Sequence, residues 1–156
     1  MLIEKCLYLA IPGNHTIEIK RKGDEIMQYI YDDIILSDLN LINSAVKNIL
    51  LDTRRMLEED LFFDFRLVLN ELLINCYEHG NKCDCDKKIL LKLKIDNKEI
   101  KILVQDEGSG VACRRKYNVE EKRPDGRGLI IVESLVDDIN YDNNKIRCKI
   151  KLTPNN

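Results

Sequence analysis

Apolar residues recur at intervals of three and four across residues 64–81, a spacing that gathers them on one face of an α-helix. Gly80 is expected to end this helix in the left-handed backbone conformation at which helices commonly stop. The apolar face is formed by Phe65, Val68, Leu69, Leu72, Leu73, Cys76 and Tyr77. The pattern therefore predicts an amphipathic helix that packs against a larger apolar surface.

The same periodicity predicts two further helices. Ser37 or Asp38 can cap a helix that runs to about residue 57, and the acidic residues 58–60 then separate it from the helix described above. A third amphipathic segment covers residues 129–136. Three helices with one apolar face each are thus available to cover one side of a sheet.

Other segments alternate between apolar and polar residues, as half-buried β-strands do. Residues 88–95 and 100–105 form two such runs around an Asp-Asn turn, and residues 146–152 form another. Residues 1–25 predict a hairpin around the turn sequence Pro-Gly-Asn, and a further strand is expected near residues 27–36. The lysines and arginine on the polar side of these strands are expected to form a solvated surface.

One-sided alternation means that one face of the sheet is buried and the other faces water. The predicted architecture is therefore an α/β two-layer sandwich, in which helices cover one face of a mixed or antiparallel sheet. We expect residues 1–156 to form a single domain, with residues 1–25 as an additional N-terminal hairpin.

Composition narrows the function classes without selecting one. The net charge of -2 gives no bulk attraction to nucleic acid or to an anionic membrane, so neither is an expected partner. No apolar run approaches the roughly 20 residues that span a bilayer, and no signal peptide is recognisable. The scattered cysteines suit buried thiols in a reducing cytoplasm, where we expect the protein to reside; Cys83 and Cys85 lack zinc-knuckle spacing.

Three polar segments concentrate the candidate chemistry. Glu71 and Asn75 lie four residues apart, so their side chains share one helix face. The DEGSG sequence at 106–110 follows a strand directly, and its glycines allow the backbone to turn and to approach a ligand. The glycines of 126–128 open a helix whose N-terminal N–H groups suit a phosphate. Taken singly, the Glu71/Asn75 pair is better explained as a solvated helix face and DEGSG as a simple turn, and the glycines of 126–128 only suggest a phosphate site.

The order of these segments is more specific than any one of them. ELLINCYEHGN, DEGSG, a short polar loop and GRGLIIVESLVDD follow one another in an order that resembles the GHKL superfamily, which includes gyrase, histidine kinases and anti-sigma-factor kinases. The resemblance covers roughly residues 29–152 and implies the Bergerat ATP-binding fold. A domain with HGN after the helix and a short polar loop is most similar to the bacterial anti-sigma factor serine-protein kinases.

The resemblance implies a role for each matching residue. Glu71 matches the acid that acts as general base on the attacking hydroxyl, and Asn75 matches the residue that holds Mg²⁺; a carboxamide oxygen suits this hard cation. Asp106 matches the acid that accepts from the adenine amino group, while Gly108 and Gly110 let the base lie close. The other residues implied to bind ATP are His79, Gly80, Gly126, Arg127, Gly128 and Leu129.

The resemblance also implies an ATP lid at residues 111–126 and two kinds of protein partner. Members of this group phosphorylate a serine on a small antagonist protein and bind a sigma factor, and they often form homodimers. The lid departs from the group at Val111-Ala112-Cys113, where an aromatic or acidic start is common. Two functions thus stay open: an ATP-dependent serine/threonine-protein kinase, and a module that uses ATP to set its shape and transfers nothing.

Overall fold

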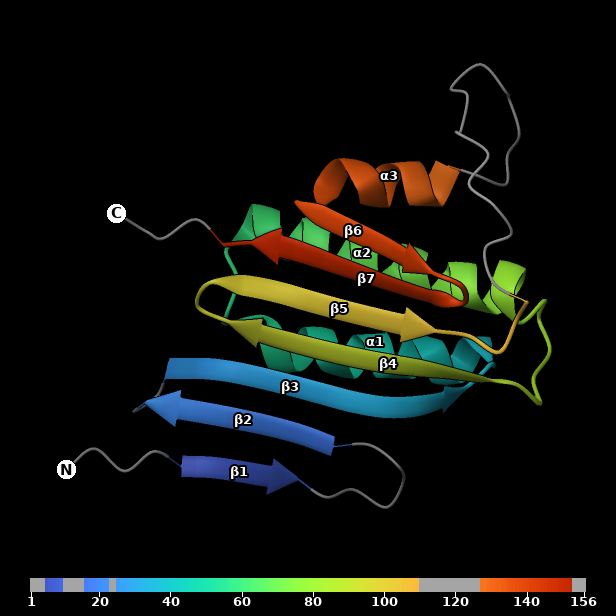
Figure 1. Cartoon of the computed structure of the whole chain (residues 1–156). Helices are drawn as coiled ribbons and strands as arrows, with labels where there is room; N and C mark the ends of the chain where they lie inside the picture. The colour runs from blue at the N-terminus through green and yellow to red at the C-terminus, as the bar shows by residue number, and fades with distance from the viewer. Residues whose placement is uncertain (1–4, 10–15, 23–24, 110–126, 153–156) are drawn as a thin grey trace.

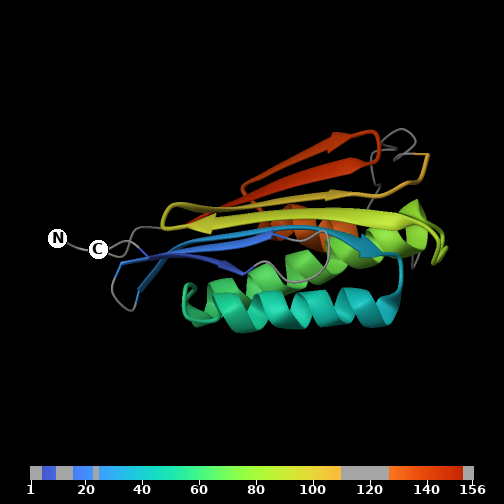
Figure 2. The ribbon, with the colours of Figure 1, turned by 90° about the horizontal axis from the view of Figure 1, so that it is seen from below.

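The computed structural model describes residues 5–9, 16–22, 25–109 and 127–152. Within these ranges the chain forms two layers, a single antiparallel sheet and a layer of helices (Figure 1). Seen along the sheet in Figure 2, all the helices lie on one face and the opposite face is uncovered. The predicted two-layer α/β sandwich is confirmed.

The sheet has seven strands in the order β1-β2-β3-β4-β5-β7-β6, and every neighbouring pair is antiparallel. Consecutive strands pair as hairpins except where helices intervene, so β4 joins β3 after two helices and β7 joins β5 after one. The strands are β1 Lys5–Leu9, β2 Thr16–Lys22, β3 Glu25–Leu36, β4 Lys88–Asp96, β5 Glu99–Gln105, β6 Asp138–Asp142 and β7 Lys145–Lys151.

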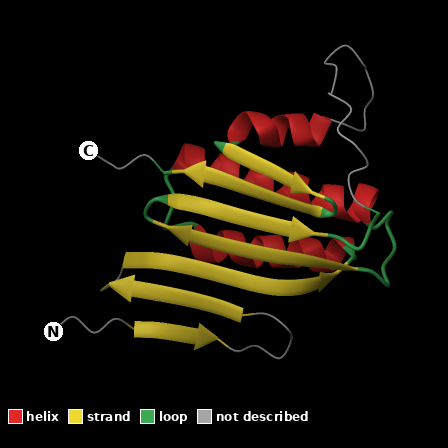
Figure 3. Ribbon diagram, viewed as in Figure 1, coloured by secondary structure: helices red, strands yellow, loops and turns green. Residues whose placement is uncertain are grey.

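The helical layer is formed by α1 Leu39–Thr53, α2 Glu59–Asn75, the π-helical turn η1 Cys76–Gly80 and α3 Arg127–Leu135 (Figure 3). The Asp38 side chain caps α1 by accepting hydrogen bonds from the N–H groups of Asn40 and Leu41, at 2.8 and 3.1 Å. Helix α1 ends four residues earlier than the sequence predicts. Helix α2 starts earlier than predicted, because Glu59 belongs to its first turn, where acidic side chains favour the helix dipole.

The core lies between α1, α2, α3 and the covered face of the sheet. The alternation predicted for β4, β5 and β7 is confirmed, since their apolar positions are buried and their lysines are not. Strand β6 was missed by the sequence prediction. Its two apolar residues, Ile139 and Tyr141, only partly cover the core, so a short segment flanked by aspartates reads as a loop.

None of the helices in the described ranges is long and apolar enough to cross a membrane. Cys76 and Cys148 are buried free thiols, as their places in the predicted helix and strand indicate, whereas Cys83 and Cys85 are exposed.

Candidate functional site

Asp106 directly follows β5, where the chain leaves the sheet and passes beside Gly80 of η1. Its side chain is 9% exposed, and desolvation by burial raises the pKa of the carboxyl above its ordinary value. The backbone N–H of Gly108 donates to Asp106 Oδ1 at 2.8 Å, and this bond and the Cys76 thiol partly offset that rise in pKa. An oriented, half-desolvated carboxylate of this kind can accept a hydrogen bond from an amino group on a planar ligand.

Gly80 and Gly108 are glycines because other atoms occupy the space beside them. A Cβ on Gly80 would lie 2.8 Å from the Asp106 Cβ and closer still to its carboxylate, while a Cβ on Gly108 would lie 2.8 Å from the Gly80 carbonyl carbon. The left-handed conformation expected for Gly80 is wrong, since its φ angle is not positive. The positive φ angles come later, at Lys82 (57°) and Cys83 (58°).

Asn81 fixes the loop around Asp106, and sequence reasoning did not identify it. Its side chain is fully buried; Nδ2 donates to the Lys88 carbonyl at 3.0 Å and Oδ1 accepts from the Glu107 N–H at 2.8 Å. The Asn81 N–H closes η1 by donating to the Cys76 carbonyl at 2.7 Å, a bond that spans five residues. One side chain therefore ties the end of the helix to β4 and to the turn after Asp106.

Asn144, in the turn between β6 and β7, holds Asp106 from the other side. The Asp106 N–H donates to the Asn144 carbonyl at 3.1 Å, and the Asn144 side-chain amide donates to the Asp106 carbonyl. The preceding residue, Asn143, has a positive φ of 52°, which turns the chain back toward β5. The only sequence signal for this clamp is the Asn-Asn turn itself, which also suits an ordinary hairpin.

Glu71 and Gly128 meet where α2 packs against α3. A Cβ on Gly128 would lie 3.3 Å from the Glu71 Cδ and collide with its Oε2, so the glycine leaves the space that the carboxylate fills. Glu71 is half-buried, Arg127 is exposed at the first position of α3, and Leu129 is buried beneath it. The structure thus brings the middle of α2 to the first turn of α3.

Asn75 and His79 lie on the same helical segment between Glu71 and Asp106. Asn75 is the last residue of α2 and is half-buried, whereas His79 is exposed in η1. π-Helical turns of this kind are frequent at functional sites. Gly110, Gly126 and the lid expected at 111–126 lie outside the described residues.

Sequence comparison identifies the family that uses these three segments. The family model described as a histidine kinase-like ATPase domain matches residues 36–153. The chain belongs to this family. Membership of the histidine kinase-like ATPase family implies ATP binding. The match also confirms the family that the order of the segments indicated.

A curated relative of this histidine kinase-like ATPase domain is named anti-sigma F factor, from Bacillus velezensis. The two chains are 24% identical over 102 residues, which cover 58% of this chain and 66% of the relative. The chain therefore spans just under two thirds of the length of the curated relative that it matches. This similarity agrees with the anti-sigma-factor branch indicated by the motifs.

Proposed function

We propose that this protein is an ATP-dependent serine/threonine-protein kinase of the anti-sigma factor type. It phosphorylates a small antagonist protein and sequesters a sigma factor. The observation that carries the proposal is the meeting of three separate sequence segments at one end of the sheet, in a chain that belongs to the histidine kinase-like ATPase family. The similarity to a protein named anti-sigma F factor supports the choice of partners.

In this proposal the adenine ring lies against Gly80 and Gly108, and its amino group donates to the Asp106 carboxylate. The two glycines support this placement, because their lack of side chains lets the Asp106 carboxylate pack closely against the backbone of both segments, which fixes the position of the carboxylate. Asn81 and Asn144 hold the Asp106 peptide in place through backbone and side-chain bonds. Guanine would present a carbonyl oxygen to the carboxylate, so Asp106 would favour adenine over guanine.

The phosphates then extend along α2 toward the first turn of α3. Gly128 and Gly126 let the triphosphate approach the helix N–H groups, and Arg127, Leu129 and His79 complete the ATP-binding set.

The residues at this point fit a Mg²⁺ ion. The Asn75 carboxamide oxygen would hold it, one turn from the Glu71 carboxylate that fills the space at Gly128. Bound Mg²⁺ supplies neutralisation of the phosphate charge. Glu71 takes the proton of the substrate serine hydroxyl, whose oxygen then forms a bond to the γ-phosphorus as ADP leaves.

The remaining features of the proposal concern the whole protein. The chain acts as a single domain in the cytoplasm, with the N-terminal hairpin as an addition to the sheet, and it forms a homodimer. It contacts neither nucleic acid nor a membrane directly, because its net charge of -2 provides no general attraction to either.

The nucleotide part is tested by isothermal titration of the purified protein with ATP and with GTP. ATP is expected to bind and GTP to bind far more weakly. Asp106→Asn should weaken ATP binding by roughly tenfold or more, because a hydrogen bond to a charged group contributes about 1.5–3 kcal/mol. Equal ATP affinity in the variant and the parent protein would remove Asp106 from the adenine site.

The kinase part is tested with labelled ATP, Mg²⁺ and a candidate antagonist protein from the source organism. Glu71→Ala should bind ATP nearly as well as the parent protein and lose phosphate transfer by roughly 10²–10⁴-fold, the usual contribution of a general base. Asn75→Ala should lose both binding and transfer. An active Glu71→Ala variant refutes the base assignment; ATP binding and partner binding without transfer by the parent protein would instead identify an ATP-gated module.

A further inference from the structure

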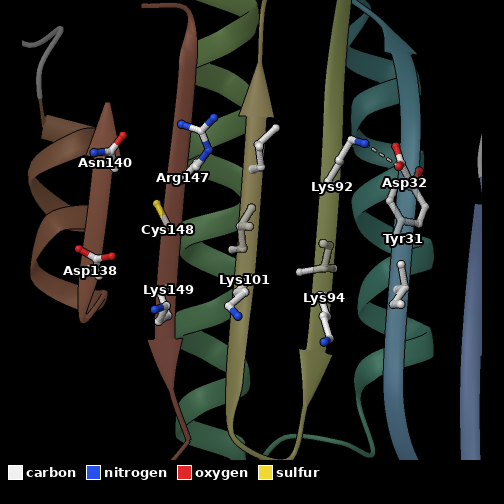
Figure 4. Close-up of a pocket in the computed structure, with 14 residues that line it drawn as sticks. Tyr31, Asp32, Lys92, Lys94, Lys101, Asp138, Asn140, Arg147, Cys148 and Lys149 are labelled. Carbon is white, nitrogen blue, oxygen red and sulfur yellow. Dashed lines mark ion pairs between the residues drawn. The ribbon is translucent and has the colours of Figure 1, made fainter. Parts of the chain in front are cut away.

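The uncovered face of the sheet contains a groove that lies on the opposite side of the sheet from the helices and is separate from the proposed nucleotide site (Figure 4). Its volume is about 420 Å³. Figure 4 shows side chains from β3, β4, β5, β7 and β6 rising along it. The cationic residues that line the groove are Lys92, Lys94, Lys101, Arg147 and Lys149. The solvated stripe expected from the sequence is therefore a shaped, positively charged surface.

The strand register places three of these lysines directly beside one another. Lys94 is opposite Lys101 across β4 and β5, and Lys101 is opposite Lys149 across β5 and β7. Adjacent strands are about 4.8 Å apart, and like charges directly opposite on neighbouring strands destabilise a sheet. An anion bound over this row would relieve the repulsion.

Among the described residues, nearby carboxylates partly relieve this repulsion, and Asp138 on β6 lies directly opposite Lys149. Asp96 pairs with Lys94 at 3.7 Å, and Glu99 pairs with Lys101 and with Lys149, the latter at 4.0 Å. Both acids lie at the turn between β4 and β5, beyond the row. The lysine side chains of these pairs are 37% to 50% exposed, so water screens the pairs and a second anion can reach the lysine charges.

The lining is also partly apolar. The residues that line the groove include five cationic side chains and two carboxylates, Asp32 on β3 and Asp138 on β6, and Asp32 forms an ion pair with Lys92 at 3.0 Å (Figure 4). The half-buried side chains of Ile30 and Leu103 lie between the charged groups. A ligand that fits must present negative charge to the centre, apolar surface beside it, and little negative charge to the two sides.

We propose that this groove is a docking site for a short acidic segment of a partner protein, in which carboxylates alternate with apolar residues. Its carboxylates contact Lys94, Lys101 and Lys149, and its apolar residues cover Ile30 and Leu103. A long uniform polyanion such as nucleic acid fits less well, because Asp138 lies directly beside Lys149 at one end of the lysine row and would repel it. The site requires no nucleotide, so it stands apart from the proposed kinase activity.

The probe is a short fluorescein-labelled peptide with the repeating sequence Glu-Glu-Leu, with a Lys-Lys-Leu peptide of equal length as its control. Fluorescence anisotropy should detect the acidic peptide alone, with an affinity that falls as NaCl is raised. The triple variant K94Q/K101Q/K149Q should bind it about tenfold more weakly or worse, since three charge contacts are lost. The matched control is K47Q/K82Q/K98Q, which changes three exposed lysines outside the groove and should bind within about twofold of the parent protein.

Two further measurements make the result decisive. ATP affinity should be the same in both triple variants, which would show that both are folded. If K94Q/K101Q/K149Q does not fold, the acidic peptide is titrated into the parent protein instead, and the amide chemical-shift changes that it causes must map to β4, β5 and β7. Tighter binding of labelled oligothymidine than of the acidic peptide would overturn the protein-segment proposal. So would equal effects of the two triple variants, or loss of self-association in K94Q/K101Q/K149Q, which would identify a second copy of the chain as the occupant.

Discussion

Gly128→Ala changes a single hydrogen atom to a methyl group at the point where α2 and α3 meet. The new Cβ would collide with the Glu71 Oε2 and lie 3.3 Å from its Cδ. The atom that must move is the far end of a flexible side chain, and no backbone atom lies as close. The expected result is a folded protein that binds ATP more weakly, because Gly128 belongs to the proposed phosphate site, and that transfers phosphate poorly even when it is saturated with ATP.

The magnitudes favour retention of the fold. Alanine is preferred over glycine within a helix by about 1 kcal/mol, and Gly128 is the second residue of α3. Moving Glu71 to another rotamer or holding it off its rotamer costs about 0.5–1.5 kcal/mol. The two contributions nearly cancel, so the melting temperature should change by no more than about 2–4 °C. The carboxylate must move by roughly 1 Å, and a displacement of that size from productive geometry can reduce a rate about 10²-fold.

The assay pairs thermal unfolding and ATP titration with single-turnover phosphate transfer. Gly80→Ala is the matched control, because its Cβ would collide with Asp106, whose short side chain is tied to Gly108 and cannot withdraw. That variant should be destabilised and should bind ATP weakly. Full transfer activity in Gly128→Ala would refute the assignment of Glu71, and a large loss of stability would show that the space beside Gly128 is tighter than described.

Three other predictions concern the residues around the adenine site. Burial raises the pKa of the Asp106 carboxyl in the folded protein. The contribution of Asp106 to stability is therefore full below its unfolded-state pKa and is lost as the pH rises through its folded-state pKa. Calorimetry without nucleotide should find that Asp106→Asn does not lose stability in this pH range and is more stable than the parent protein near neutral pH. Asn81→Ala leaves the Glu107 N–H and the Lys88 carbonyl without their partner and should reduce the free energy of unfolding by about 1–3 kcal/mol in urea. Asn144→Ala should cost less, because Asn144 is half-buried and its backbone bond from Asp106 remains; a larger loss than for Asn81→Ala would contradict this ranking.

The sequence predicted those elements whose apolar pattern is long. The buried positions of α2 recur with the period of a helix, and those of β4 and β5 alternate with the period of a strand. The two layers and the covered face of the sheet can be predicted from these periods. Strand β6 has too few apolar residues to show a period, and only its pairing with β7 makes it a strand. The end of α1 depends on the turn that follows Thr53, which periodicity does not reveal.

For the candidate site, the sequence indicated the residue types but not the contacts that hold them. Asn81 and Asn144 act on backbone groups 26 and 38 residues away, and such partners leave no trace in the local sequence. Gly80 shows the same difficulty. A glycine at a helix end predicts a left-handed cap, whereas the structure requires a glycine at position 80 because the Asp106 carboxylate occupies the space of a side chain there.

The order of the strands has a consequence for how the site assembles. The hairpins β4–β5 and β6–β7 are local and close rapidly, whereas β7 joins β5 only after the chain between them has been brought back to the sheet. The clamp between Asp106 and Asn144 spans that late junction. A partly folded chain that holds β4 and β5 but has released the C-terminal hairpin therefore has no complete adenine site. Bound ATP should accordingly slow amide hydrogen exchange in β6 and β7, far along the chain from α2.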